Sequence, residues 1–239
     1  MGDDRLRLSR VWQSILAGVH RLTGTASTRH RVHPDRWRKT AQEGEWDFHA
    51  TNEWRRSPQF EVDNARLWRH FGFAADSMQG RTVLDFGAGS KLRSRFFADA
   101  RIVAIEPLAD RFRALDFCDL NLAAEVHSRP GEERIEGLAG RADLIVSINV
   151  LDHCYDFDRA VSNIAGYLAP AGKAFLSFDI HDEADELHPL LLTEESCERS
   201  FSDAGLEIRQ KSHGVGPFGM SYGHGRAVNY WLVPQGDRP

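Results

Sequence analysis

The sequence predicts an α/β fold, a doubly wound and mostly parallel sheet with helices on both faces and a helical cap before it. Short apolar runs beyond residue 80 are continuous rather than alternating, as in strands that are buried on both faces of a parallel sheet. Segments with a helical spacing of apolar residues separate these runs. Strand and helix therefore alternate along the chain, which is the pattern of a doubly wound sheet.

Residues 1–30 precede this pattern and are predicted to form an amphipathic helix and a linker rich in Gly, Ser and Thr. The helix is expected to pack on the main domain or on a second subunit, and the alternative is a helix that lies in a membrane interface. Its apolar residues recur at helical spacing, with arginines on the other side: Leu8, Trp12, Ile15, Leu16, Val19 and Leu22.

Residues 31–80 are predicted to form a helical cap that is rich in aromatic residues. One clear helical pattern runs from Val62 to Phe71. Large aromatic side chains gain most when they are buried, so we expect the cap to cover a surface of the main domain. The aromatic residues of this stretch include Trp37, Trp46, Trp54 and Trp68.

Residues 81–239 form the predicted α/β domain. Its strands are expected at Val83–Phe86, Ile102–Ile105, Leu144–Val150, Ala174–Phe178, Leu206–Lys211 and Val228–Val233. Helices are expected between them at Leu92–Ala98, Asp110–Leu115, Glu132–Leu138, Phe157–Leu168 and Thr193–Ala204.

Composition excludes several classes of protein. Hydrophobic residues at 41% and charged residues at 27% exclude collagen-like and disordered chains. No apolar run approaches the roughly 18 residues of a membrane-spanning helix, and the N-terminal arginines are not followed by a cleavage site, so neither integral membrane association nor secretion is expected. Three widely spaced cysteines without a C-x-x-C pair argue against a disulfide framework and favour a cytoplasmic location.

The net charge of −5 is unevenly distributed, because residues 1–40 carry nine Lys or Arg against three Asp. The acidic main domain argues against a general affinity for nucleic acid. Arginine outnumbers lysine, which fits a bacterial origin with a GC-rich genome.

A buried strand that ends in a glycine-rich turn is the sharpest local signal. Asp85, Gly87, Gly89 and Ser90 form this turn, where glycine allows the backbone to approach a ligand closely. Glu106 closes the next strand, about 20 residues further on, where a carboxylate can accept hydrogen bonds from both hydroxyls of a ribose. Together they predict a cofactor that contains adenosine. A dinucleotide fingerprint needs a third glycine where Leu92 stands, which argues against NAD.

These residues resemble the class I S-adenosylmethionine-dependent methyltransferases, whose first motif has the form D/E-x-G-x-G. The resemblance covers residues 82–178 well and the C-terminal strands loosely. It implies a sheet of seven strands and S-adenosyl-L-methionine as the cofactor. Residues 150–153 and 168–172 match later landmarks of the family. The implied cofactor-binding residues are Asp85, Gly87, Gly89, Ser90, Glu106, Pro107 and Asn149.

The chain departs from the family at two places. Ser90 and Lys91 stand where many members have a third glycine, and Pro130 stands near the place of an acid that usually holds the adenine amino group. We assign the following Gly131 and Glu132 to the adenine pocket.

Four further residues are assigned to the methyl donor and the acceptor. A sulfonium methyl is already electrophilic, so the protein mainly positions the nucleophile and excludes water. His153, with Asp152, is the candidate base for a hydroxyl acceptor, and the alternative is a histidine that only packs beside the cofactor. Asp179 and His181 are candidate substrate-binding residues in an acidic loop. No metal site is predicted, although Asp152, Asp179 and His181 have suitable side chains.

One arginine of the cap is expected to pair with the methionine carboxylate of the cofactor. Arg55 and Arg56 are the choices, and Arg56 is the residue assigned. The glycine-rich segment 214–225 is expected to be either a lid over the substrate or a hairpin.

The predicted function is methyl transfer from S-adenosylmethionine to a small molecule, with O-methylation ranked before N-methylation. The alternatives are a lyase or cyclase that uses the same cofactor and a non-catalytic scaffold subunit. The expected partner is a small-molecule substrate, without nucleic acid or integral membrane association, and a homodimer is left open.

Overall fold

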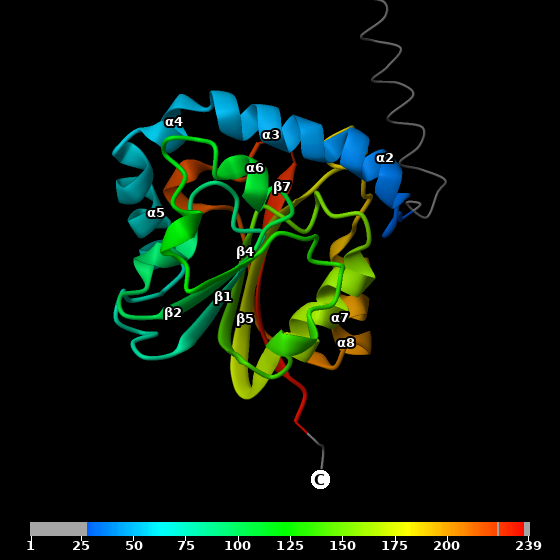
Figure 1. Cartoon of the computed structure of the whole chain (residues 1–239). Helices are drawn as coiled ribbons and strands as arrows, with labels where there is room; N and C mark the ends of the chain where they lie inside the picture. Colours follow the sequence, from blue (N-terminus) through cyan, green and yellow to red (C-terminus); the bar gives the residue numbers. More distant parts are fainter. Residues whose placement is uncertain (1–27, 224, 237–239) are drawn as a thin grey trace, which may run out of the picture.

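A computed structural model of the chain describes residues 28–223 and 225–236. The predicted amphipathic helix lies outside these residues. A seven-stranded sheet runs through the molecule in the order β3-β2-β1-β4-β5-β7-β6 (Figure 1). Strand β7 is antiparallel to both of its neighbours and the other pairs are parallel, which confirms the predicted doubly wound, mostly parallel sheet. The strands are β1 Thr82–Phe86, β2 Arg101–Ile105, β3 Glu125–His127, β4 Ala142–Ile148, β5 Leu168–Ile180, β6 Leu206–His213 and β7 Arg226–Pro234.

The two faces of the sheet belong to separate cores, because neighbouring residues of a strand point to opposite faces. On one face Leu84 packs with residues of α7 (Phe157–Tyr167) and α8 (Glu194–Asp203). On the other face Val83 packs around Trp68, a fully buried side chain. Continuous apolar strands are therefore needed here, as the sequence pattern indicated.

The helices α7 and α8 begin where side chains satisfy their first backbone donors. The Asp156 carboxylate accepts a hydrogen bond from the Arg159 amide at the start of α7. Thr193 and Ser196 form a capping box at the start of α8. Such caps contribute about 1 kcal/mol each and define where the two helices start.

Four helices lie before the sheet, within residues 31–80. They are α2 (Pro34–Lys39), α3 (Ala41–Thr51), α4 (Glu53–Arg56) and α5 (Gln59–His70). In Figure 1, α2, α3 and α4 form a row along one end of the sheet, and α5 turns down beside it. Two tryptophans of these helices form hydrogen bonds to the α/β domain. The Trp37 indole donates to the His153 carbonyl at 2.7 Å, and the Trp68 indole donates to the Arg93 carbonyl at 2.8 Å.

Three predicted helices are much shorter than expected. Leu92–Ala98 contains only the 3-10 turn η1 (Arg93–Phe96), Asp110–Leu115 only α6 (Ala109–Phe112), and Glu132–Leu138 only η3 (Glu136–Leu138). In the first segment, Asp119 accepts a hydrogen bond from the Leu92 amide and Asp85 accepts one from the Ser94 amide, which fixes the path of this short turn.

Two strands also differ from the predicted pattern. Strand β3 lies at the sheet edge and is only half-buried, so it has no apolar run to mark it. Strand β5 already begins at Leu168, and its pairing with β4 shifts register between Ala142 and Leu144, so the expected 168–172 turn is part of an irregular strand start. Among the described residues, no helix is long and apolar enough to cross a membrane.

Candidate functional site

A cavity of about 600 Å³ lies between the carboxyl ends of the strands and the cap. This is the edge at which open α/β sheets bind their ligands. Most of the predicted site residues line it: Asp85, Gly87, Gly89, Glu106, Pro107, Gly131, Glu132, Asn149, His153 and Asp179. The remaining four, Ser90, Arg56, Asp152 and His181, are not among its lining residues.

The glycine-rich turn after β1 has a backbone that only glycine adopts easily. Gly87 has φ of +77° and Gly89 has φ of +66°. A Cβ on Gly89 would lie 2.7 Å from Cε1 of His49, so the space there is already filled. Ser90 sits behind the turn, where its hydroxyl is 2.9 Å from the Nδ1 atom of His49. The buried imidazole of His49, a residue of the cap, therefore contacts the glycine-rich turn at both Gly89 and Ser90.

Glu106 and Asp85 are buried carboxyls held by backbone amides of the same turn region. Glu106 accepts hydrogen bonds from Gly89 at 2.8 Å and from Leu108 at 2.9 Å. Burial raises the pKa of Glu106 to about 7 and that of Asp85 to about 6. A polar ligand with hydroxyl or ammonium donors would stabilise the ionised forms.

Gly131 and Glu132 are at the far side of the cavity. A Cβ on Gly131 would overlap the ring of Phe86, so this glycine permits close packing. Glu132 accepts a hydrogen bond from the Tyr155 amide at 2.6 Å, and burial raises its pKa to about 7. The Glu132 carboxylate therefore also holds the turn that follows β4.

The two neighbouring arginines of the cap point in different directions. Arg56 forms an ion pair with Asp116 at 3.2 Å and lies outside the cavity. Arg55 lines the cavity, and its Nε atom is buried without a hydrogen-bond partner among the described residues. Arg93, which the sequence analysis did not select, also lines the cavity, and its guanidinium lies 5.3 Å from the Phe60 ring centroid. Within the described residues, neither Arg55 nor Arg93 forms an ion pair with a carboxylate.

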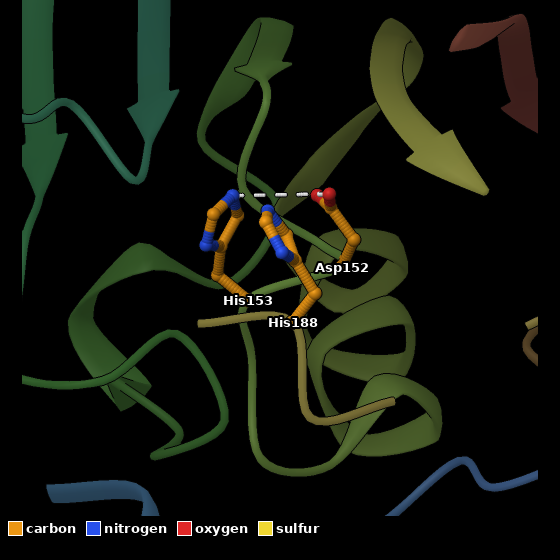
Figure 2. A group of neighbouring side chains, drawn as sticks. All are labelled: Asp152, His153 and His188. Carbon is orange, nitrogen blue, oxygen red and sulfur yellow. Dashed lines mark ion pairs between the residues drawn. The ribbon is translucent and has the colours of Figure 1, made fainter. Parts of the chain in front are cut away.

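His153 follows β4 and is held between two carboxylates. Its Nδ1 lies 2.9 Å from Glu45 of α3, and its Nε2 lies 3.8 Å from Asp152. Burial alone would lower the pKa of His153, but Asp152 and Glu45 raise it to about 9. Figure 2 shows His153 beside the ring of His188, with Asp152 facing both. The carboxyl ends of the strands thus gather an acid and imidazole cluster.

The loop after β5 supplies the rest of this cluster. His181 pairs with Asp152 at 3.0 Å, so both lie behind the cavity wall rather than in it. The His188 ring reaches the cavity and packs 4.5 Å from His153 between ring centroids. Neither Glu45 nor His188 was selected as a site residue, although His188 belongs to the acidic loop that the sequence analysis marked.

Asp179 lies at the cavity, but its carboxylate is engaged by the backbone. It accepts hydrogen bonds from the amides of Tyr222 at 3.0 Å and Gly223 at 3.2 Å. The Tyr222 hydroxyl in turn lies 2.5 Å from Ser177 of β5. Asp179 therefore holds Tyr222 and Gly223 of the glycine-rich segment against the sheet.

The lining fits the cofactor that the motifs imply. A ribose needs a carboxylate beside a glycine turn, and Glu106 with Gly89 has that arrangement. A methionine carboxylate needs a cation, and the Nε atom of Arg55 is buried there without a hydrogen bond among the described residues. Aromatic side chains at the same cavity supply apolar surface for an adenine or an acceptor: Phe48, Trp54, Phe112 and Tyr222.

Known proteins resemble this chain in sequence and in fold. Residues 63–211, more than half of the chain, match the family model of a methyltransferase domain. A ubiquinone biosynthesis O-methyltransferase of Bordetella avium is 31% identical over 108 residues, and this match spans 43% of the chain and 44% of the relative's length.

Two solved structures show the likeness in fold. One is 1,6-didemethyltoxoflavin-N1-methyltransferase of Burkholderia thailandensis, solved with 1,6-didemethyltoxoflavin and S-adenosylhomocysteine bound. Its TM-score is 0.59 at 16% identity, over 86% of this chain and 92% of that chain. The other is the [4+2]-cyclase SpnF, with a TM-score of 0.53 at 17% identity, over 74% of this chain and 81% of that chain. At such identities a structural likeness shows the fold alone.

Proposed function

The chain belongs to the methyltransferase domain family and is an S-adenosylmethionine-dependent methyltransferase, and from that premise we propose that it methylates a hydroxyl oxygen of a small molecule. The observation that carries the proposal is one cavity that holds both the glycine turn with Glu106 and the imidazole of His153. The proposed cofactor and acceptor residues then line a single cavity, as methyl transfer requires.

A small acceptor is supported by the size and cover of this space. About 600 Å³ is within the usual range of small-molecule pockets and must hold cofactor and acceptor together. The helix α3 lies along the cavity, where Phe48 and Glu45 form part of its wall. An acceptor larger than a few rings would have to displace this wall.

We assign the cofactor end of the cavity to residues of β1, β2 and the cap. Glu106 accepts the ribose hydroxyls, Gly87 and Gly89 allow close approach of the backbone, and Arg55 takes the methionine carboxylate in place of Arg56. Asp85, Pro107 and Asn149 complete this end, and Gly131 with Glu132 borders the adenine. When bound, the cofactor supplies an electrophilic methyl group, so these residues need only hold it in line with the acceptor.

We assign the acceptor end to His153, positioned by Asp152 and Glu45. His153 is the imidazole at the cavity wall, and its two carboxylate neighbours fix its ring. A hydroxyl is a poor nucleophile while it keeps its proton. An acceptor oxygen therefore needs polar groups of this kind that interact with that proton. The name of the Bordetella avium relative also favours oxygen over nitrogen.

The test is product analysis with a cofactor that carries an isotopically labelled methyl group. The protein is incubated with panels of small phenols, hydroxy acids and amines, and labelled products are identified by mass spectrometry. We expect S-adenosylhomocysteine and a labelled ether or ester, and loss of both in His153→Ala. Labelled amines would overturn O-methylation, and methylthioadenosine as the only nucleoside product would indicate a lyase or cyclase instead.

A further inference from the structure

The side chains around His153 have the composition of a cation site rather than of a simple ion pair. Asp152, His153 and His188 each offer one ligand atom, and these atoms lie within 4.8 Å of one another. All three come from the loops that follow β4 and β5, and Figure 2 shows that they face one another. Two imidazoles and one carboxylate form a ligand set that is typical of catalytic zinc sites.

Two atoms of this cluster are buried without a hydrogen bond among the described residues, the Oδ1 atom of Asp152 and the Nε2 atom of His153. Asp152 is only 2% exposed, so bulk solvent does not reach its carboxylate. A cation beside this carboxylate would offset the cost of burying its charge, since burial of a charge is unfavourable without a counter-charge.

Each of the two imidazoles is oriented by a second carboxylate. Glu45 lies 2.9 Å from Nδ1 of His153, and Asp185 lies 3.0 Å from Nδ1 of His188. In metal sites, a ligating histidine usually pairs its other ring nitrogen with a carboxylate or carbonyl. These two carboxylates lie beside the Nδ1 atoms, which leaves the Nε2 atom of each ring to bind a cation. Both histidines thus have one ring nitrogen beside a carboxylate, and a single ion pair does not account for both.

The proposed ligand atoms lie somewhat farther apart than they would around a bound cation. Ligand atoms about 2.1 Å from a tetrahedral zinc ion are about 3.4 Å apart. Here the three ligand atoms lie within 4.8 Å of one another, and Nε2 of His153 is 3.8 Å from Oδ2 of Asp152, so the side chains must move closer to bind one ion. His181 contacts that same Oδ2 at 3.0 Å, which holds the carboxylate in place and leaves Oδ1 as the oxygen without a hydrogen bond among the described residues.

From these contacts we propose that Asp152, His153 and His188 bind a divalent transition-metal ion of the zinc class, with one coordination position open to the cavity. His153 and His188 both line the cavity, so an acceptor oxygen reaches that position directly. The inference rests on the proposed O-methylation only for what occupies the open position. Cation binding itself does not depend on an acceptor, which separates the two tests.

The first experiment measures cation binding without any acceptor. The full chain is stripped with a chelator, and Zn²⁺ is titrated by calorimetry while Co²⁺ is followed by its visible absorption. We expect one equivalent to bind, with at least ten-fold weaker binding in His188→Gln and Asp152→Asn. The control is His213→Gln, which removes an exposed histidine that pairs with Glu194 on the far side of β6 and should bind as the wild type does.

Folding of each variant is checked by its thermal melt and by binding of S-adenosylmethionine, which lies at the other end of the cavity. Binding of no equivalent by the wild-type chain would overturn the inference, and so would equal affinity of wild type and His188→Gln. The proposed function would survive either result if labelled ethers still formed. If the cation binds in one equivalent but only amines are methylated, the metal site stands and O-methylation fails.

Discussion

The two ends of the cavity are built in different ways. The centre of the proposed cofactor end comes from one short stretch of chain, in which β1, the glycine turn and the end of β2 place Gly89 and Glu106 within hydrogen-bond distance. The proposed acceptor end gathers Glu45 of α3, His153 after β4 and His188 after β5, which lie far apart in the sequence. A site built by a local motif can be recognised in the sequence, whereas a site built by loops that only the fold brings together cannot.

The largest expected effect is on the acceptor end. His153→Ala should reduce methyl transfer by about 10²- to 10⁴-fold, because it removes the polar group at the acceptor oxygen. The cofactor end should be untouched, so the dissociation constant of S-adenosylmethionine should change less than two-fold. Steady-state formation of S-adenosylhomocysteine measures the first effect and calorimetry the second. Equal losses of methyl transfer and of S-adenosylmethionine affinity would place His153 at the cofactor instead.

The next effect concerns Glu106. Glu106→Ala should weaken S-adenosylmethionine binding by about 10- to 100-fold, because hydrogen bonds to a carboxylate contribute about 1.5–3 kcal/mol. Glu106→Gln keeps the shape and one acceptor atom, so it should lose less affinity than the alanine variant. Calorimetric titration of both variants checks the order. A cofactor affinity like that of wild type in Glu106→Ala would show that the ribose binds elsewhere.

The sequence analysis selected residues that the fold brings to one cavity, because the signals for the proposed cofactor end are local. Asp85, Gly87, Gly89 and Glu106 all line the cavity, and each follows from the pattern of strand, turn and strand. Arg56 shows the limit of this reasoning, since successive residues of a helix turn by about 100° and only packing decides which one faces inward. The turn of α4 directs Arg55 to the cavity and Arg56 to Asp116.

Only part of the proposed acceptor end could be selected from the sequence, because tertiary packing assembles it. His153 was recognised from the motif after β4, but Glu45 is separated from it by more than 100 residues and has no motif of its own. The short turn η1 also has contacts that the sequence does not show, because Asp119, which holds the Leu92 amide, lies 27 residues further along the chain.

A matched pair of variants tests the choice of arginine. Arg55→Ala should weaken S-adenosylmethionine binding by about ten-fold, because a charge-assisted contact to the methionine carboxylate is lost. Arg56→Ala removes a half-exposed ion pair with Asp116 and should leave the affinity unchanged within two-fold. Both are measured by calorimetry, with adenosine as a ligand that lacks the carboxylate. Adenosine binding should be the same in the two variants, and a reversed order for the cofactor would return the role to Arg56.

The smallest expected effect is a pH dependence of the cofactor end. The pKa of Glu106 is raised from 4.5 to about 7, chiefly by burial and further by the Glu45 and Asp85 carboxylates. The ionised form accepts hydrogen bonds best, so S-adenosylmethionine should bind about ten-fold more weakly at pH 6 than at pH 8. Glu106→Gln should flatten this profile. Calorimetry measures the affinity for S-adenosylmethionine at both pH values. The same pH dependence in the variant as in the wild type would assign the titration to another group.

The raised pKa of Glu106 also affects the folding stability of the unliganded chain, which should fall as the pH rises. The folded state binds the proton of Glu106 more tightly than the unfolded state, so this group favours folding below pH 4.5 and its contribution is lost as the pH rises towards 7. Denaturant unfolding between pH 5 and 8 should show this loss in the wild type and less of it in Glu106→Gln.

The most direct test of the separation between the two ends is a crossed measurement on Glu106→Ala and His153→Ala, neither of which requires a known acceptor. Calorimetric binding of S-adenosylmethionine is measured for both variants and for the wild type, with thermal melts as the folding control. The account predicts that Glu106→Ala alone loses affinity. Equal loss in the two variants, or loss only in His153→Ala, would contradict the division of the cavity into a cofactor end and an acceptor end.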